Sequence, residues 1–302
     1  MTALLLALVA AFQPFPESHF DTVNGVALHY RYWNVAPTEL RGSVLLVHGF
    51  GGSTFSWRRN FDTLVANGYR VVAVDLPAYG YSSRQRGLDH TQQARAELLW
   101  QLLDQIDMTS GPPCRPVNWV LVGHSMGGGT VAAMAMQEPA RVAGVVMVDA
   151  AIYVTPAGVS SELVRLRPIR AVSEAYARRF LLNRKAAAGF LRSAYKREPD
   201  SADITGYVAP LLLPGTAEAI VDGLAYGRDF EPLDPAQITL PTLIIWGSND
   251  DWVPLKFGKR LESEIPDSEL HIIRNAGHTP METEPVQFNG LLLDFLAQLA
   301  RP

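Results

Sequence analysis

The sequence predicts an α/β fold in which a mostly parallel sheet is covered by helices on both faces. Short, unbroken runs of Val, Leu and Ile alternate along the chain with helical stretches, which is typical of such sheets. The 302 residues are 48% hydrophobic and 19% charged, enough apolar side chain for a large core and too little charge for a disordered chain. A net charge of −4 argues against a nucleic-acid partner. The single cysteine, Cys114, excludes an intrachain disulfide framework.

The first expected element is an antiparallel hairpin. Residues 20–32 alternate apolar and polar side chains around Asn24-Gly25, a dipeptide that tolerates positive φ in a tight turn. Apolar runs then predict strands, and longer periodic stretches predict helices. The strands are expected at 43–47, 71–74, 119–122, 142–148, 243–246 and 269–273, and the helices at 91–106, 126–137, 255–265 and 285–299.

The N-terminal segment, residues 1–18, contains a ten-residue apolar run at 3–12. This run is about half the length that a membrane-spanning helix needs. We expect a short helix packed on the body, on a partner or on a membrane surface. A signal peptide is the alternative, because residues 9–11 are small, but no Lys or Arg precedes Arg31. A cytoplasmic protein is therefore the first expectation and an exported one the second.

Residues 152–238 break the alternation of strands and helices. Helical patterns follow one another there without a strand-like run, which predicts a helical cap inserted between core segments 19–151 and 239–302. Between residues 152 and 200 the cap has ten basic and four acidic residues. We expect mainly a solvated face, and the alternative is a surface that approaches anionic lipid or substrate.

The pentapeptide Gly123-His124-Ser125-Met126-Gly127 matches G-x-S-x-G. It falls where the strand at 119–122 ends and a helix begins. A sharp strand-to-helix turn crowds its neighbours and strains the backbone at the serine, so glycines are needed on both sides and the hydroxyl is left exposed. Ser125 is therefore the candidate nucleophile.

A serine hydroxyl needs a base, which must itself be oriented by an acid. Asp250 comes just after the strand at 243–246, and His278 follows the strand at 269–273. The carboxyl ends of parallel strands share one edge of a sheet, so Ser125, Asp250 and His278 can meet there. Asp251 and Asp149 are the alternative acids. We favour Asp250, because Asp251 is suited to capping the segment that follows and Asp149 to turning the chain into the insertion.

The loop at residues 48–52 (HGFGG) follows the strand at 43–47, where acyl transfer needs backbone donors for the oxyanion. The amides of Phe50 and Met126 are the candidates. His48 and His124 lack partners at metal-ligand spacing, so we expect them to orient loops and predict no metal site.

Three aromatic residues near these loops, Trp57, Tyr79 and Trp252, are the candidates for contacts with substrate. Aromatic and leucine side chains of the insertion could line an acyl pocket or form the core of the cap itself, and the second is more typical of helical spacing. They are Tyr176, Phe180, Leu181, Leu182, Phe190, Tyr195, Tyr207 and residues 211–213.

These motifs together resemble the α/β-hydrolase superfamily, in its serine esterase and lipase-like branch. The resemblance rests on VLLVHGFGG (44–52), VVAVDLPAYGYSS (71–83), LVGHSMGGG (121–129), PTLIIWGSNDDWVP (241–254) and NAGHTPMETEP (275–285). It implies an eight-stranded, mostly parallel sheet, a cap between strands six and seven, an acyl-serine intermediate and no cofactor.

The residues at a few positions separate the relatives. Epoxide hydrolases and haloalkane dehalogenases place an aspartate at the nucleophile, so Ser125 argues against both. Carbon–carbon bond hydrolases usually have Asn before the serine and Trp after the histidine, where this chain has His124 and Thr279. The haloperoxidase-like and lactonase branches fit the motifs about equally well.

We therefore predict a hydrolase of small carboxylic esters with short to medium acyl chains. The alternatives are a carbon–carbon hydrolase, a lactonase, a haloperoxidase-like enzyme or a ligand sensor without turnover. Peripheral membrane contact through the N-terminal segment or the basic cap is a further alternative. The sequence does not indicate whether the protein is a monomer or an oligomer.

Overall fold

The computed structural model describes residues 13–36, 38–109, 118–153, 161–226 and 233–300. The apolar run at 3–12 and Cys114, on which two of the sequence predictions rest, lie outside the described residues.

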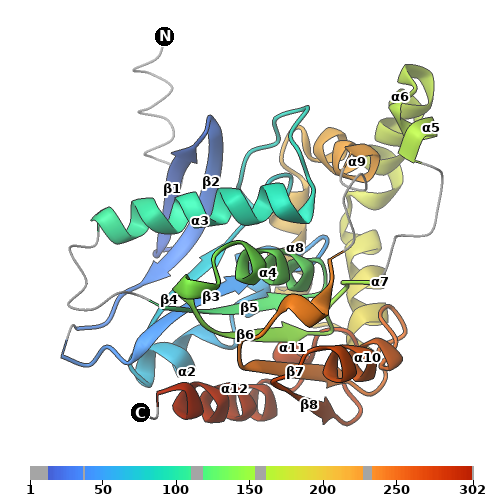
Figure 1. The fold of residues 1–302 in the computed structure, drawn as a ribbon. Coiled ribbons are helices and arrows are strands. Elements are labelled where there is room, and N and C mark those ends of the chain that lie inside the picture. Colours follow the sequence, from blue (N-terminus) through green and yellow to red (C-terminus); the bar gives the residue numbers. More distant parts are fainter. Residues whose placement is uncertain (1–12, 37, 110–117, 154–160, 227–232, 301–302) are drawn as a thin grey trace.

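Eight strands form one sheet in the order β1-β2-β4-β3-β5-β6-β7-β8 (Figure 1). β1 and β2 pair antiparallel, β2 pairs antiparallel with β4, and all other neighbours are parallel. The predicted α/β fold with a mostly parallel eight-stranded sheet is confirmed. The strands are β1 Ser18–Val23, β2 Val26–Trp33, β3 Gly42–Val47, β4 Tyr69–Val74, β5 Trp119–His124, β6 Val142–Val148, β7 Thr242–Gly247 and β8 Ser268–Ile273.

The turn between β1 and β2 has the predicted chemistry. Val23 pairs with Val26, so the loop contains just Asn24 and Gly25, whose φ angles are 50° and 80°. Two consecutive positive φ angles match the twist of a two-residue hairpin, and Asn and Gly adopt them at low cost.

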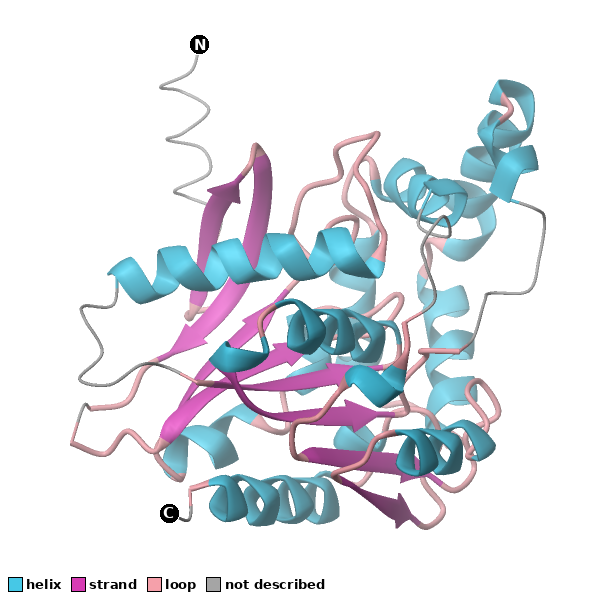
Figure 2. Ribbon diagram, in the orientation of Figure 1, coloured by secondary structure: helices cyan, strands magenta, loops and turns pink. Residues whose placement is uncertain are grey.

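Side chains of the central strands alternate between two buried layers. Leu45 and Val47 of β3 pack into one layer with α3, α4 and α10, whereas Val44 and Leu46 pack into the other with α2 and α12. Helices therefore cover both faces of the sheet (Figure 2). Their bounds are α2 Phe61–Ala66, α3 Gln92–Thr109, α4 Met126–Gln137, α10 Lys256–Glu264 and α12 Pro285–Leu299, with short turns η1 Thr54–Trp57, η2 Pro139–Arg141 and α11 Pro280–Thr283.

The described residues between β6 and β7 are helical. They comprise α5 Ser161–Arg165, α6 Arg167–Tyr176, the π-helical turn η3 Ala177–Leu181, α7 Arg184–Tyr195, α8 Ser201–Leu211, α9 Thr216–Tyr226 and η4 Pro235–Gln237. We refer to α5 through α9 as the cap. Over the described ranges no single helix is long and apolar enough to cross a membrane. The bent pair α8 and α9 reaches that length and composition together, with an angle of 80° between its halves.

Candidate active site

The carboxyl ends of four parallel strands bring the chemically important side chains to one edge of the sheet. Ser125 follows β5, Asp149 follows β6, Asp250 lies three residues beyond β7, and His278 lies five residues beyond β8. These strands are neighbours in the sheet and share a direction, so the loops that follow them share one edge, where Asp250 and His278 form a hydrogen bond.

Ser125 occupies a strained turn between β5 and α4. Its φ and ψ angles are 51° and −116°, a region that non-glycine residues rarely adopt and that is typical of functional sites. The Ser125 N–H donates to the Val148 carbonyl at 2.9 Å, and the Ser125 carbonyl accepts from Ala151 N at 2.9 Å. A Cβ atom on Gly127 would lie 2.4 Å from the Val47 carbonyl oxygen. Glycine is thus required where α4 passes β3.

His278 and Asp250 form the acid and base pair. Nδ1 of His278 lies 2.7 Å from Oδ2 of Asp250, so this nitrogen carries a hydrogen and donates a hydrogen bond to the carboxylate. Asp250 Oδ1 accepts from the N–H groups of Trp252 and Val253, at 2.8 and 3.0 Å. Burial opposes ionisation of Asp250, but the hydrogen bond and charge of His278 outweigh it and lower the pKa of Asp250 below its usual range. The imidazole is thereby fixed with Nε2 as its free basic nitrogen.

The two alternative acids have other partners. Asp251 is exposed and forms an ion pair with Lys196, instead of capping the following segment. Asp149 is fully buried and accepts from Gly247 N at 3.0 Å. Burial, followed by the charge of Asp250, raises the pKa of Asp149 well above its ordinary value. Of the three carboxyl groups, Asp250 is therefore the one that orients His278.

Asp149, Asp250 and His278 also present donor atoms within 4.8 Å of one another, a spacing that a cation could share. However, Nδ1 of His278 and Oδ2 of Asp250 are hydrogen-bonded to each other, and the raised pKa of Asp149 disfavours the carboxylate form that binds a metal. The donor set therefore fits a hydrogen-bonded acid and base pair better than a metal site.

His124 and His48 orient loops, as expected. His124 Nε2 lies 2.7 Å from the His278 carbonyl oxygen, so this nitrogen donates and ties the serine turn to the histidine loop. Burial, then the charge of His278, lowers the pKa of His124 to about 3. His48 donates from Nδ1 to the Gly49 carbonyl at 2.7 Å and accepts from Leu76 N at 3.0 Å. Both rings act as neutral braces beneath the site.

The two candidate oxyanion donors lie on either side of the serine turn. Met126 is the first residue of α4, so its N–H has no acceptor within the helix. Phe50 lies inside a turn closed by the hydrogen bond from Gly52 N to the Gly49 carbonyl, which is 3.1 Å long. A Cβ atom on Gly49 would lie 2.9 Å from Ser125 Cβ, which shows how closely this loop approaches the serine.

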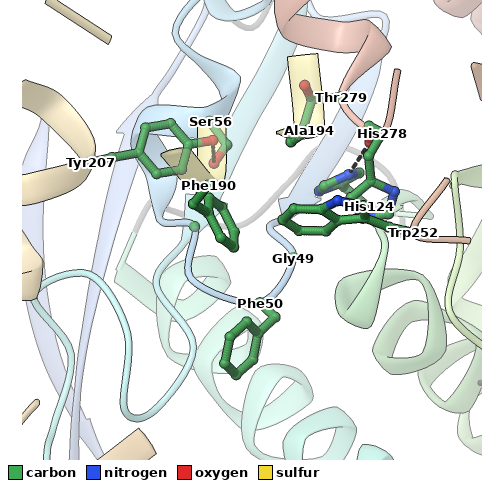
Figure 3. Close-up of a pocket in the computed structure, with 11 residues that line it drawn as sticks. Gly49, Phe50, Ser56, His124, Phe190, Ala194, Tyr207, Trp252, His278 and Thr279 are labelled. Carbon is green, nitrogen blue, oxygen red and sulfur yellow. Dashed lines mark hydrogen bonds between the residues drawn. The ribbon is translucent and has the colours of Figure 1, made fainter. Parts of the chain in front are cut away.

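A pocket of about 250 Å³, including its open mouth, lies in front of His278. Figure 3 shows Trp252 beside His278 and the hydroxyls of Ser56 and Tyr207 meeting at the far side of the pocket. The Trp252 ring lies 5.1 Å from the His278 ring and 4.7 Å from the Phe190 ring. The residues lining the pocket are Gly49, Phe50, Gly52, Ser56, His124, Phe190, Ala194, Tyr207, Trp252, His278 and Thr279.

Two of the predicted substrate contacts are wrong, and Trp252 alone of the three lines the pocket. Trp57 is fully buried in the core layer beneath α12, where its ring packs against Phe288. Tyr79 is also buried and packs edge-on against Phe50 and His48, so it supports the loop from behind. An aromatic residue next to a motif loop can face either the pocket or the core, and local sequence does not distinguish the two.

The cap residues divide into two groups. Phe190 and Tyr207 reach the pocket, and Tyr195 is buried next to it. Tyr176, Phe180 and Leu181 are exposed instead, so they neither line the acyl pocket nor form a cap core. α7 also closes directly over the histidine loop, because His278 N donates to the Ala194 carbonyl at 2.8 Å.

Sequence reasoning missed a polar cluster that joins the cap to the core behind the pocket. Glu282 is fully buried and accepts from the hydroxyls of Tyr195 and Tyr207, at 2.7 and 2.5 Å. Arg58 forms ion pairs with both Glu282 and Asp203 of α8. Arg58 and Glu282 are 224 residues apart, and no local pattern marks either one. The one available signal was an acidic residue shortly after the catalytic histidine, within NAGHTPMETEP.

The chain is similar in sequence to known hydrolases and similar in fold to solved structures. The chain is 28% identical over 277 residues to the uncharacterized hydrolase YugF of Bacillus subtilis, which covers 91% of this chain and 96% of that protein. It is 30% identical over 273 residues to a 2-hydroxy-6-oxononadienedioate/2-hydroxy-6-oxononatrienedioate hydrolase of Escherichia coli, covering 85% of this chain and 87% of the relative. A bromoperoxidase from Bacillus anthracis has the same fold, with a TM-score of 0.74 at 24% identity over 93% of this chain and 99% of the other.

Residues 44–291 match the Alpha/beta hydrolase family. This match spans β3 to α12 and includes the serine turn, the Asp250 loop and the His278 loop. The chain belongs to the alpha/beta hydrolase family.

Proposed function

We propose that this hydrolase cleaves carboxylic esters through an acyl-serine intermediate formed on Ser125. The observation that carries the proposal is the 2.7 Å hydrogen bond from His278 to a buried, ionised Asp250, at the same sheet edge as a serine held in a strained turn. Nucleophile, base and orienting acid are the parts that acyl transfer requires.

In the proposed reaction Ser125 Oγ attacks the acyl carbon and His278 Nε2 takes the hydroxyl proton. The Phe50 and Met126 N–H groups stabilise the oxyanion that develops, and each such donor typically contributes about 3–4 kcal/mol to the transition state. His278 then gives the proton to the leaving alkoxide oxygen. Water, deprotonated by His278, releases the acid and restores the serine.

The pocket favours small, uncharged esters. Its space of about 250 Å³ includes the open mouth, so the enclosed part is smaller still and suits a small acyl group. None of the described residues that line it is Lys or Arg, so an anionic acyl group would find no charged partner. The lining supplies apolar contacts from Phe190 and Trp252 and a pair of hydroxyls, Ser56 and Tyr207, that lie 2.9 Å apart. We expect short to medium acyl chains.

A series of p-nitrophenyl esters of increasing chain length tests this proposal. We expect repeated turnovers, and we expect the highest kcat/KM for acyl chains of fewer than about twelve carbons. Ser125→Ala should abolish both turnover and labelling by a fluorophosphonate. A single stoichiometric release would instead support a ligand sensor, and full turnover by Ser125→Ala would remove the proposed mechanism.

The Escherichia coli relative supports a second candidate, hydrolysis of a carbon–carbon bond in a hydroxy-oxo-diacid. His124 precedes Ser125 and Thr279 follows His278, where carbon–carbon bond hydrolases usually have Asn and Trp. These two residues favour the ester, and so does a pocket lining without Lys or Arg. The two are separated by incubating the enzyme with an ester panel and with a 2-hydroxy-6-oxo-dienedioate. Faster turnover of the dienedioate would replace the ester proposal.

A further inference from the structure

The outermost helix of the cap has its apolar side chains directed to solvent. Val172 and Tyr176 of α6 and Phe180 of η3 are 70%, 56% and 55% exposed, and they recur every four residues along a continuous helical path. Residues spaced in this way lie on one face. Leu163, Leu166 and Leu181 are also exposed nearby. We call Val172, Tyr176, Phe180 and these three leucines the apolar face.

The opposite side of α6 faces the protein through charged groups. Glu174 pairs with Arg86 at 2.8 Å, and Arg170 pairs with the fully buried Asp222 of α9. A surface helix normally buries its apolar stripe and exposes its charges. α6 does the reverse, and none of its described side chains is buried. Such a reversal is expected where the apolar stripe serves a partner outside the molecule.

The charges beside the apolar face are positive. Arg179 and Lys185 are exposed, and the Arg179 guanidinium lies 5.4 Å from the Phe180 ring. Between residues 163 and 197 the chain contains ten basic residues and a single acidic one, Glu174, which is occupied by its ion pair. The face therefore combines aromatic and aliphatic side chains with cations.

We propose that this face of the cap binds an anionic lipid surface. Arginine and lysine attract acidic headgroups, while Val172, Tyr176 and Phe180 enter the boundary between headgroups and acyl chains. A second copy of the chain fits less well, because a twofold contact through this face would set Arg179 close to the identical cation of the other copy. In Figure 1, α5 and α6 lie at the periphery, away from the sheet, where a planar surface can reach them.

Sedimentation of the full chain with vesicles tests the proposal. Vesicles of phosphatidylcholine alone are compared with vesicles of phosphatidylcholine and phosphatidylglycerol in a ratio of about 7:3, at low and high salt. We expect binding to the mixed vesicles that weakens with salt. Arg179→Gln should weaken it about fivefold, and the double variant Tyr176→Ser/Phe180→Ser at least about tenfold.

Matched controls come from other faces of the protein. Val286 of α12 is 88% exposed, so Val286→Ser removes an equally exposed apolar group. Lys256→Gln/Lys259→Gln removes two exposed cations from α10. Both should leave vesicle binding unchanged, and Ser125→Ala should bind like the wild type, so that failure of the proposed ester chemistry would not affect this result.

Three outcomes would overturn the proposal. The first is equal binding to neutral and anionic vesicles, and the second is equal weakening by the control variants and by the variants of the apolar face. In the third, the chain sediments as a dimer that Tyr176→Ser/Phe180→Ser dissociates, which would show that a second copy covers the face.

Discussion

Asp149 and Asp250 are two buried carboxyl groups that follow neighbouring parallel strands, and their pKa values are shifted in opposite directions. Asp250 accepts from His278 and from two backbone N–H groups, which keep it ionised. Asp149 accepts one hydrogen bond, from Gly247 N, through Oδ1, and its Oδ2 has no donor among the described residues. Burial and the neighbouring charge of Asp250 raise the pKa of Asp149, which favours its neutral form.

This difference predicts that the substitution of Asp by Asn has a large effect on kcat at position 250 and a small effect at position 149. Asp250→Asn removes the charge that orients and stabilises the imidazole, so kcat should fall about 10⁴-fold. Asp149→Asn replaces a neutral acid by a neutral amide of the same shape, so kcat should change less than about threefold. Steady-state rates on p-nitrophenyl acetate measure both, and a large loss with Asp149→Asn together with a small one for Asp250→Asn would reverse the assignment.

Asp149→Asn should also change how stability depends on pH. A carboxyl group whose pKa is raised in the folded state stabilises the fold fully below its unfolded pKa and loses that contribution as the pH rises. The variant lacks this titration. Relative to the wild type it should therefore gain stability as the pH rises above about 4, the ordinary pKa of an aspartate, which urea unfolding at several pH values would measure.

A second Ser-His-Asp cluster lies at the same edge of the sheet, beside the antiparallel strands β1 and β2, where Asp75 directly follows β4. Ser18 Oγ lies 2.7 Å from His29 Nε2, and His29 Nδ1 lies 2.6 Å from Asp75 Oδ2. All three residues are buried. Asp75 also accepts from Thr54 N and Tyr81 N, at 2.6 and 2.8 Å, and the Ser18 hydroxyl accepts from Phe15 N at 3.1 Å. This cluster fastens loops, and it does not line the pocket.

We therefore expect a fluorophosphonate probe to label Ser125 and not Ser18. Ser18→Ala should keep full labelling and an unchanged kcat, with a loss of about 1–2 kcal/mol in unfolding free energy because a buried imidazole loses its partner. Peptide mapping by mass spectrometry identifies the labelled serine. Residual labelling in Ser125→Ala, mapped to Ser18, would contradict this interpretation.

Arg58 and Glu282 join the cap to the core, and their pairing predicts a large effect on stability. Glu282 is fully buried, and burial raises its pKa while the Arg58 charge opposes the rise. Arg58→Met leaves a buried carboxyl group without its cation, which should cost about 3–5 kcal/mol of unfolding free energy. Because the pKa of Glu282 would rise further, the cost in unfolding free energy should be greater at pH 8 than at pH 5. The difference should be about 1.4 kcal/mol for each unit by which the pKa rises.

A double-mutant cycle isolates this interaction. Glu282→Gln keeps the shape of the side chain and removes its charge, so Arg58→Met/Glu282→Gln should recover part of the stability lost in Arg58→Met. Urea unfolding measures all four proteins. Strict additivity of the two single changes would show that Arg58 and Glu282 do not stabilise each other.

The sequence predicted the features that repeat or that need special backbone geometry. β6, α4 and α12 have the predicted bounds, because their apolar runs end at glycine, proline or polar residues. The strained turn at Ser125 was visible because it requires Gly123 and Gly127. The location of Trp57 in the core and the protonation of Asp149 depend on which side chains surround them in three dimensions. The same holds for Arg58, whose partner Glu282 is distant in sequence.

His124 provides the last prediction, a loss of stability on acidification. Its pKa of about 3 in the folded protein lies below the ordinary value of about 6.5 for an unfolded histidine. Between these values the unfolded chain binds the additional proton, so folding stability is lost as the pH falls through this window. At about pH 5 this group alone should cost about 2 kcal/mol relative to pH 7.5. His124→Asn removes the titration and retains a donor near the His278 carbonyl.

The loss on acidification should therefore be about 2 kcal/mol smaller in His124→Asn than in the wild type. His90, which has a pKa lowered to about 4 by burial and by Arg95, is present in both proteins and cancels from the comparison. Urea unfolding of the two proteins at both pH values measures the difference. If the variant lost as much stability as the wild type between these pH values, the buried, neutral state of His124 would not be the source of the acid sensitivity.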